Sequence, residues 1–325
     1  MARELYSVGI VGLGHVAGHH KAAIEGSDAF RLVAVCDPDE SRFEGFAPGV
    51  ACFTDIGGLL QAPSVDVVVV ASPNRMHVRH GMDAMAAGKW VVMEKPLAES
   101  RADFERFAAR RTELDGRCTL ALHSAFGLDV DWFCRSMAEE RLPPLTLSSF
   151  HAGFYDPYFE EGLLLDRASS LGGSWLDSGI NALSVVCRLV SPERLSVTDS
   201  RMTRLAAAGC REVQGTVEFE FTRDGSHGSG TIDTNWTLGR NSKITRLGCT
   251  DGREYVLDHT AQAVLLRESG EERVLFTCDN GLPRLTNHYI GVFADLARQL
   301  RAGQDNFSYC QRLHSLFFEA EDRSP

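Results

Sequence analysis

The sequence lacks the cysteine patterns that mark a disulfide framework or a zinc site. Its nine cysteines are scattered, no two of them form a C-x-x-C pair, and their number is odd. A disulfide-bonded secreted scaffold is therefore excluded, and a reducing compartment such as the cytoplasm is expected. No metal site is predicted.

The chain also lacks an excess of basic residues and any long apolar run. It has 33 Lys and Arg residues against 44 Asp and Glu residues, which gives a net charge of −11. Nucleic acids and anionic membrane surfaces attract basic patches, so we expect neither as the main partner. No apolar run approaches the roughly 20 residues that a transmembrane helix needs, and the amino terminus carries no signal-peptide pattern.

The composition that remains is that of a globular protein of two domains. The chain has 325 residues, of which 44% are hydrophobic and 24% are charged. This length favours two domains over one. Because the pattern of the sequence changes after His123, we expect residues 1–124 to form the first domain and residues 125–325 the second.

Short apolar runs alternate with helical patterns through the first domain. The predicted strands are Tyr6–Val11, Arg31–Cys36, Val65–Ala71, Trp90–Met93 and Thr119–Leu122. The predicted helices are His15–Gly26, a short helix near Asp55–Gln61, Met76–Ala87 and Arg101–Leu114. Strands that alternate with helices indicate βαβ units with right-handed crossovers, and therefore a parallel sheet of the Rossmann type.

The turn after the first predicted strand has the sequence G-x-G-x-x-A. Gly12 allows the tight turn, Gly14 lets a pyrophosphate approach the backbone, and Ala17 lets the helix pack closely on the strand. The phosphates would bind the N-terminus of that helix, whose N–H groups and dipole favour anions, beside His15 and Val16. The alternative is a glycine-rich turn without a ligand.

Asp37 ends the second predicted strand, near the offset from the glycines at which an acidic residue contacts a ribose. Its carboxylate would accept hydrogen bonds from the adenosine ribose and repel a 2′-phosphate. NAD is therefore the expected cofactor, with NADP as the alternative because Arg42 lies close in the sequence. The other interpretation of Asp37 is a cap on the turn before Pro38.

A turn after the third predicted strand carries Ser72, Pro73 and Asn74, and Asn74 can cap the helix that follows. In this topology the turn faces the cofactor crevice, so these three residues and His77 are candidate cofactor contacts. The alternative is a plain strand-to-helix turn in which His77 is a structural partner.

Glu94, Lys95 and Pro96 follow the apolar run that predicts the fourth strand. Ligands of open α/β sheets bind outside the carboxyl ends of the strands, so Lys95 stands where chemistry is expected. Pro96 ends the strand because it cannot donate a ladder hydrogen bond. We expect Lys95 to lie between a nicotinamide cofactor and a sugar-like substrate, and Glu94 to lie beside the cofactor.

The second domain is predicted to consist mainly of strands. Residues 213–222 alternate between apolar and polar side chains, as in a half-exposed antiparallel strand. Residues 151–161 have no period and predict a loop, which carries His151 and Tyr155 as candidate substrate contacts or else covers the core. The other predicted elements are a helix from about Asp129 to Glu140, a strand at Leu145–Phe150, further strands between Leu195 and Phe276, and two closing helices, Arg284–Arg301 and Phe307–Glu321, that pack on the first domain.

The chain resembles the Gfo/Idh/MocA oxidoreductase family in four motifs, which run from Gly12 to Ala17, from Ser72 to His77, from Gly88 to Pro96 and from Gly172 to Asn181. The resemblance implies a Rossmann domain followed by an α+β domain with a large open, mostly antiparallel sheet. It also implies that Lys95 touches both substrate and nicotinamide. In this family another subunit covers the open sheet, so a homodimer or a dimer-based oligomer is expected.

The fourth motif departs from the common family pattern. Many members carry Asp-x-x-x-His, with His as the acid/base group, whereas this chain has Asp177 and Asn181. The two residues share one face of a predicted helix, where a carboxylate and an amide can grip vicinal hydroxyls. This variant resembles the branch of L-arabinose and D-galactose 1-dehydrogenases, in which the Asp is implicated in acid/base work and the Asn in holding the sugar. A solvated polar helix edge is the other interpretation.

The resulting hypothesis is an NAD(P)-dependent aldose 1-dehydrogenase with a small polyhydroxy substrate. Hydride from C1 of a pyranose passes to nicotinamide and leaves a lactone, while Asp177 accepts the hydroxyl proton. Lys95 polarises the C1 oxygen, Asn181 orients the sugar, and His123 and His151 are further candidate substrate contacts. The alternatives are a dehydrogenase of a secondary alcohol in an inositol or nucleotide sugar, and a cofactor-binding regulator without turnover.

Overall fold

The computed structural model describes residues 5–158, 171–204 and 212–324. The chain forms two compact units, and each unit is built from two stretches of sequence. The first unit comprises Met1–Leu122 and Leu285–Gln311, and the second comprises His123–Arg284 and Arg312–Pro325.

The first unit contains a six-stranded sheet in which every neighbouring pair is parallel. Its strands are β1 (Tyr6–Val11), β2 (Phe30–Cys36), β3 (Ala51–Phe53), β4 (Val67–Val70), β5 (Trp90–Glu94) and β6 (Cys118–Ala121). Their spatial order is β3-β2-β1-β4-β5-β6. The predicted Rossmann-type sheet is confirmed. The sequence did not indicate β3, because this edge strand has three residues and its side chains are largely exposed.

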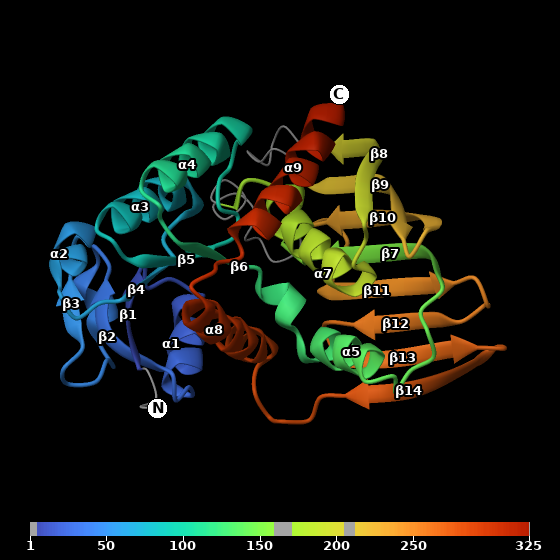
Figure 1. Cartoon of the computed structure of the whole chain (residues 1–325), viewed down its shortest axis with the longest axis horizontal. Helices are drawn as coiled ribbons and strands as arrows, with labels where there is room; N and C mark the ends of the chain where they lie inside the picture. The colour runs from blue at the N-terminus through green and yellow to red at the C-terminus, as the bar shows by residue number, and fades with distance from the viewer. Residues whose placement is uncertain (1–4, 159–170, 205–211, 325) are drawn as a thin grey trace. The chain divides into compact units, whose positions relative to one another are not determined.

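The helices of this unit are α1 (Ala17–Glu25), α2 (Ile56–Gln61), α3 (Asn74–Ala86), α4 (Arg101–Glu113) and α8 (Arg284–Ala302), with a 3-10 turn η1 (Glu40–Phe43). The strand order reverses direction between β1 and β4, and right-handed crossovers therefore place helices on both faces of the sheet. Figure 1 shows α3 and α4 on one face and α1 with α8 on the other. The crevice at this reversal is where ligands of such sheets bind.

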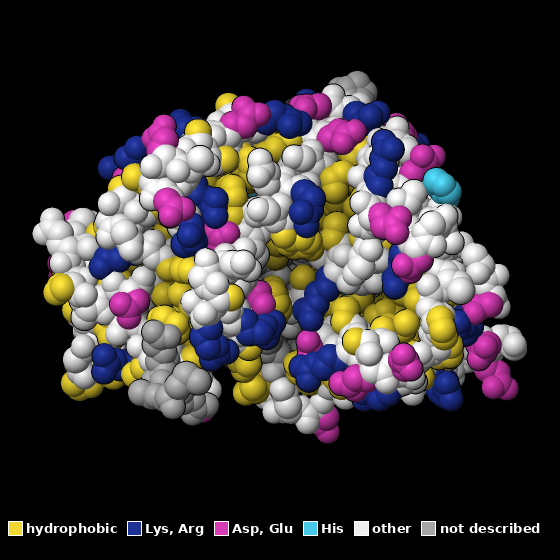
Figure 2. Space-filling model, viewed as in Figure 1, with side chains coloured by type: hydrophobic (Ala, Val, Ile, Leu, Met, Phe, Trp, Pro, Cys, Tyr) yellow, Lys and Arg dark blue, Asp and Glu magenta, His cyan; other side chains and the backbone are white. Residues whose placement is uncertain are grey.

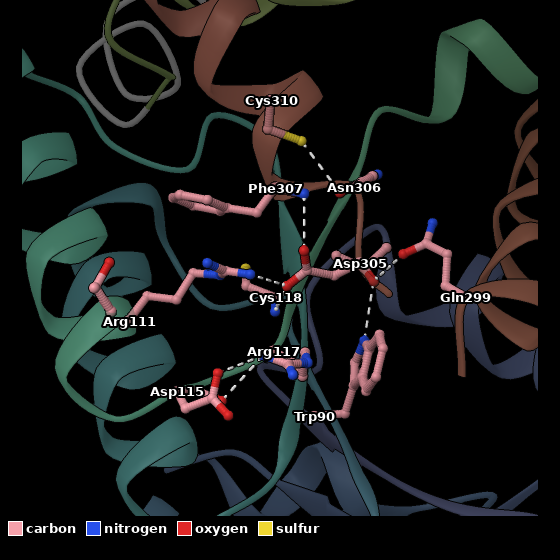
Figure 3. Close-up of polar contacts among 12 residues, drawn as sticks. Trp90, Arg111, Asp115, Arg117, Cys118, Gln299, Asp305, Asn306, Phe307 and Cys310 are labelled. Carbon is pink, nitrogen blue, oxygen red and sulfur yellow. Dashed lines mark hydrogen bonds and ion pairs between the residues drawn. The ribbon is translucent and has the colours of Figure 1, made fainter. Parts of the chain in front are cut away.

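Strand β6 forms an edge of the sheet, and side chains from the segment before α9 (Phe307–Arg323) cover it (Figure 3). Asn306 accepts the N–H of Leu120 at 2.9 Å and donates to the carbonyl of the same residue at 3.0 Å. Asp305 accepts the N–H of Cys118 at 2.8 Å and pairs with Arg111 at 2.7 Å. The edge thereby has side-chain partners where another strand would bind, which protects it from intermolecular pairing.

The second unit contains an eight-stranded sheet of order β14-β13-β12-β11-β7-β10-β9-β8. Its strands are β7 (Leu147–Tyr155), β8 (Arg194–Thr203), β9 (Gln214–Arg223), β10 (Ser226–Asn235), β11 (Ser242–Cys249), β12 (Glu254–Asp258), β13 (Ala263–Glu268) and β14 (Glu271–Thr277). Neighbours are antiparallel except for β7 and β10, which are parallel. The large, mostly antiparallel sheet and the predicted fold class are confirmed.

Strand β7 corrects the prediction of a loop over residues 151–161. The strand continues to Tyr155, because residues 151–155 pair with β10 on one side and β11 on the other. The alternation is present but weak, since Ala152 and Phe154 are buried while Gly153 offers no side chain to mark the opposite face. The end of the predicted loop, residues 159–161, lies outside the described residues.

The helical elements of this unit are η2 (His123–Phe126), α5 (Leu128–Ala138), a π-helical turn η3 (Trp175–Gly179), α7 (Ile180–Val190) and the greater part of α9. Figure 1 shows α5 and α7 on one face of the sheet, here called the inner face. Inward side chains of the strands are buried against them, including Phe154, Phe219 and Leu247. The opposite, outer face carries polar side chains such as Glu218 and Arg246, which accounts for the period of two along these strands.

The surface carries charges of both signs. Lys and Arg side chains are interspersed with Asp and Glu side chains over the face drawn in Figure 2. Within the described residues, no helix is both long enough and apolar enough to cross a membrane.

The edge contacts of β6 should contribute measurably to stability. In Asn306→Ala, the N–H of Leu120 would lose its partner, while the carbonyl of Leu120 would keep only the N–H of Leu122. The free energy of unfolding should therefore fall by about 1–3 kcal/mol. Urea unfolding of the variant and of the exposed control Gln304→Ala measures this. Equal stability of the two variants would contradict the role given to Asn306.

Candidate active site

The turn after β1 requires glycine at position 12. Gly12 has a φ of +91°, and a Cβ atom there would lie 2.6 Å from the carbonyl oxygen of Ala71 and from backbone atoms of Ser72. The turn after β1 is thus pressed against the turn after β4, at the point where the strand order reverses. The positive φ agrees with the tight turn that Gly12 was predicted to allow.

The start of α1 is open to a ligand. A Cβ at Gly14 would meet no atom within 4 Å, so the backbone there can be approached closely. The helix begins at Ala17 after Val16, which supplies no side-chain cap, and His15 precedes it as an exposed residue. Uncapped N–H groups beside an open glycine fit the pyrophosphate of a dinucleotide.

Asp37 lies directly behind this turn and is buried, with 6% of its surface exposed. Its Oδ2 accepts the N–H of Leu13 at 2.8 Å, and its Oδ1 accepts the N–H of Asp39 at 3.0 Å. The carboxylate therefore holds the glycine turn to the end of β2. Arg42 Nη1 lies 3.7 Å from Asp37 Oδ2 and is half exposed, which puts a cation beside this carboxylate.

Ser72, Pro73 and Asn74 form the turn between β4 and α3. Asn74 is the first residue of α3 and Pro73 occupies the N-cap, so Asn74 does not cap this helix as the sequence suggested. His77 is buried beneath the turn, and its ring nitrogens lie 2.7 Å from the carbonyl oxygens of Ser72 and Pro96. Burial lowers the pKa of His77, although the two carbonyl contacts and the charge of Glu94 oppose this effect. His77 thus ties the Ser72 turn to the residues around Lys95.

Glu94 is buried at the end of β5 and belongs to a cluster with His20 and Tyr289. His20 Nε2 lies 2.8 Å from Glu94 Oε1, and the hydroxyl of Tyr289 donates to the same oxygen at 2.6 Å. Burial would raise the pKa of Glu94, but these hydrogen bonds and the nearby charge of Lys95 bring the net shift downward. Burial and the charge of Glu94 raise the pKa of Tyr289 well above its usual value. The cluster joins α1, β5 and α8.

Lys95 follows this cluster directly and is half-buried. Its N–H donates to Glu94 Oε2 at 3.2 Å, so the carboxylate that is held by His20 and Tyr289 also fixes the backbone of the lysine. The structure places Lys95 at the carboxyl end of β5, as predicted, and in the same unit as the Gly12 turn, Asp37 and the Ser72 turn.

Asp177 and Asn181 lie in the second unit, where the helix begins as a π-turn. The sequence predicted an ordinary helix from about Gly173, but residues Trp175–Gly179 are π-helical and α7 follows from Ile180. The buried carboxylate of Glu212 accepts the N–H of Trp175 at 2.7 Å and caps the turn. Single π-turns inside helices are frequent at functional sites.

The π-turn brings Asp177 and Asn181 into contact, as the spacing predicted. Both are buried, with 8% and 6% of their surfaces exposed. The Nδ2 group of Asn181 donates to the carbonyl of Asp177 at 3.4 Å. Asn181 Oδ1 is buried and has no hydrogen-bond partner among the described residues, which leaves one acceptor unsatisfied.

Three further polar residues surround this pair and were not predicted from the sequence. Ser178 Oγ donates to Asp156 Oδ2 at 2.8 Å, and Lys243 Nζ donates to Asp156 Oδ1 at 2.6 Å. Burial lowers the pKa of Lys243, while the charges of Asp156 and Asp177 oppose that shift. The available signal was the alternation of β11, in which Lys243 occupies a buried position.

The remaining predicted substrate contacts do not all lie near this pair. His123 is buried in η2, an element that packs against α7. His151 and Tyr155 alternate with the buried Ala152 and Phe154, and therefore point to the outer face of the sheet. His151 lies 2.8 Å from Asp233 there. The structure thus brings Asp177, Asn181 and η2 to the inner face, and separates His151 and Tyr155 from them.

Comparison with known proteins identifies the first unit. Residues 6–122 match the model of the GFO_IDH_MocA family, described as an oxidoreductase family with an NAD-binding Rossmann fold. Through this domain the chain is similar to the Gfo/Idh/MocA oxidoreductases, the family that its motifs predicted. The open turn at Gly14 and the placement of Asp37 fit the cofactor of that family.

The relatives include enzymes for inositols and sugars. Inositol 2-dehydrogenase 1 of Saccharopolyspora erythraea is 38% identical over 107 residues, which cover 31% of this chain and 32% of that protein. Galactose 1-dehydrogenase of Pseudomonas fluorescens is 28% identical over 195 residues, 56% of this chain and 57% of that one. These stretches span less than two thirds of either relative. The D-galactose-1-dehydrogenase structure from Rhizobium etli shares the fold, with a TM-score of 0.77, 20% identity and coverage of 100% of this chain and 97% of that chain.

The cluster around Glu94 makes a prediction about stability and pH. Tyr289→Phe removes one donor to a buried carboxylate, so the free energy of unfolding at pH 7 should fall by about 1.5–3 kcal/mol. Because the folded pKa of Glu94 lies below its unfolded value of about 4.3, the stabilisation is present above that pH and is lost as the pH falls through the folded pKa. The cost of the substitution should therefore shrink below about pH 4.

Urea unfolding at a series of pH values provides the measurement. Tyr255→Phe is the matched control, since the hydroxyl of Tyr255 accepts from Arg253, which stays charged throughout. The control should lose the same stability at every pH. A cost of Tyr289→Phe that is equally independent of pH would contradict the proposed charge on Glu94.

Proposed function

We propose that the protein is an NAD(P)-dependent aldose 1-dehydrogenase that oxidises a pyranose to its lactone. The observation that carries the proposal is the burial of Asp177 and Asn181 one helical turn apart, in the motif that resembles the aldose 1-dehydrogenase branch by carrying Asn instead of the common His. An Asn cannot take a proton at neutral pH, so the acid/base work falls to the carboxylate. The unsatisfied Oδ1 of Asn181 supports a role in accepting a hydrogen bond from a sugar hydroxyl.

The residues of the chain would divide the reaction as follows. NAD, when bound, supplies the acceptor for the C1 hydride. Asp177 accepts the proton of the C1 hydroxyl as the hydride leaves, because the carbon that loses hydride becomes electron-poor. The Lys95 ammonium donates to the C1 oxygen and polarises it. Asn181 holds a neighbouring hydroxyl and thereby orients C1.

A second candidate is oxidation of a secondary alcohol in an inositol. It is favoured by the 38% identity to inositol 2-dehydrogenase 1, but that stretch covers only 32% of the relative. The replacement of His by Asn at position 181 supports the aldose instead. A panel of aldoses, inositols and nucleotide sugars, assayed by NADH and NADPH formation, distinguishes the two candidates. Turnover of inositols alone would overturn the first, and cofactor binding without any turnover would favour a regulator.

Substitution of the proposed catalytic residues tests their roles. Lys95→Met and Asp177→Asn should each lower kcat by about 10²–10⁴-fold, the usual contribution of a positioned proton-transfer or polarising group. Both variants should still bind NAD, which quenching of protein fluorescence can follow. Lys21→Met, which removes an exposed lysine, is the control and should keep full activity. Full activity of either test variant would exclude its assigned role.

We also propose that the protein acts as a homodimer in the cytoplasm. The free thiols of the described cysteines support a reducing compartment. The outer face of the eight-stranded sheet has a hollow lined by side chains of both signs, among them Glu218, Arg246 and Glu254. Such a face can pair with its own copy about a two-fold axis, with each arginine meeting an acidic residue of the partner.

The dimer proposal has a direct test by light scattering after size-exclusion chromatography. The wild-type chain should have twice the mass of the monomer, and Arg246→Glu should shift it toward the monomer because like charges would then meet. Arg106→Glu changes an exposed arginine of α4, outside the eight-stranded sheet, and serves as the charge-matched control. A monomeric wild-type protein would rule the proposal out.

A further inference from the structure

Lys243 occupies a position in β11 where the strand pattern calls for an apolar side chain. The inward residues of this strand are Lys243, Thr245, Leu247 and Cys249, and all four are buried. A lysine is almost never buried unless it is paired, because the loss of hydration is costly. A charged side chain at an inward position of a strand, where apolar side chains are expected, indicates a functional constraint on that position.

The contacts of Lys243 form a connected path to the π-turn. Its Nζ donates to Asp156 Oδ1 at 2.6 Å and to Asn241 Oδ1 at 2.9 Å. The other oxygen of Asp156 accepts the hydroxyl of Ser178 at 2.8 Å. Ser178 is the residue after Asp177, so the ion pair between two strands holds the backbone that carries the proposed base.

Stability alone does not account for this arrangement. Lys243 and Asp156 each expose about a tenth of their side chains, 10% and 11%. A buried ion pair is often no better than well-packed apolar residues of the same volume, since the desolvation cost cancels the attraction. The presence of the ion pair is better explained by the contact of Asp156 with Ser178, which links the pair to the π-turn.

The charges near Lys243 also connect it with the π-turn. The charge of Asp177 reaches Lys243, as do those of Asp156 and Arg284. Lys243 therefore adds a positive charge near two buried carboxylates, one of which is the proposed base. Its loss would weaken the electrostatic compensation of both carboxylates.

We propose that Lys243 and Asp156 are positioning residues that fix the orientation of Asp177 by holding Ser178 in the π-turn. This inference rests on the proposed role of Asp177 in sugar oxidation. The ion pair does not touch the reacting carbon. It restricts the π-turn to one arrangement, so that Asp177 and Asn181 are presented together, and a displacement of about 1 Å there would cost roughly a hundredfold in rate.

Three variants separate positioning from folding. Ser178→Ala removes the link and leaves the ion pair intact. Lys243→Met removes the cation that pairs with the buried Asp156 and is expected to destabilise the fold. The double variant Lys243→Met, Asp156→Leu is therefore the better test, because it removes both charges together. Lys243→Arg retains the charge and tests rescue. Arg267→Met removes an exposed ion pair with Glu272 of the same sheet and is the control.

Two measurements are made on each variant that unfolds cooperatively. The first is steady-state kinetics with the sugar that the wild type oxidises best: kcat should fall about a hundredfold in Ser178→Ala and in the double variant, with an unchanged Kd for NAD and partial recovery in Lys243→Arg. The second is amide hydrogen exchange, which should become faster across Trp175–Gly179 and remain unchanged in β9. The control should match the wild type in both.

The outcomes distinguish this inference from the proposed function. If no sugar is oxidised by the wild type, the proposed function fails, while hydrogen exchange still decides whether the ion pair orders the π-turn. Unchanged exchange across Trp175–Gly179 in Ser178→Ala and the double variant overturns the inference. If the wild type oxidises a sugar, a kcat of these two variants within twofold of the wild-type value also overturns the inference.

Discussion

A carboxylate that is removed from water has to be hydrogen-bonded, and this constraint shapes both units of the chain. Glu94 in the first unit accepts from Tyr289 and lies against His20, and Asp156 in the second accepts from Ser178 and Lys243. An ionised group without such partners would cost several kcal/mol. The hydrogen-bond partners come from distant parts of the sequence. Each buried carboxylate therefore holds several elements of its unit together.

Each buried carboxylate also stands beside a residue of the proposed chemistry. Glu94 precedes Lys95 and accepts its N–H, and Asp156 holds the neighbour of Asp177. In both cases the buried carboxylate contacts either the residue of the proposed chemistry or its neighbour in the chain, and would not itself touch the substrate. Residues locked in this way keep catalytic side chains in place without occupying the site themselves.

Much of the first unit could be predicted, because its signals are local. The parallel strands are short apolar runs, and Gly12, Gly14 and Asp37 stand at fixed offsets from them. The edge strand β3 was missed because it has only three residues, too few to show a strand pattern. The partners of Glu94 were missed as well, since nothing in the sequence near His20 or Tyr289 reveals that a carboxylate lies between them.

The second unit was harder to predict, for related reasons. The extension of β7 through Tyr155 depends on pairing with β10 and β11, which lie far along the chain. The π-turn depends on tertiary contacts, such as the cap that Glu212 provides. Lys243 could be recognised as unusual only once the register of β11 was known. The pair of Asp177 and Asn181 was predictable because its spacing is itself local.

The division of the first unit into two stretches of sequence has a consequence for biosynthesis. Residues Leu285–Gln311 supply Tyr289 to the buried Glu94 and supply Asp305 and Asn306 to the open edge of β6. A ribosome that has made only the first 122 residues has therefore produced a sheet with a bare edge and a carboxylate short of one donor. The first unit is therefore complete only after residues 285–311 have been made, and until then its unpaired edge is open to intermolecular strand pairing.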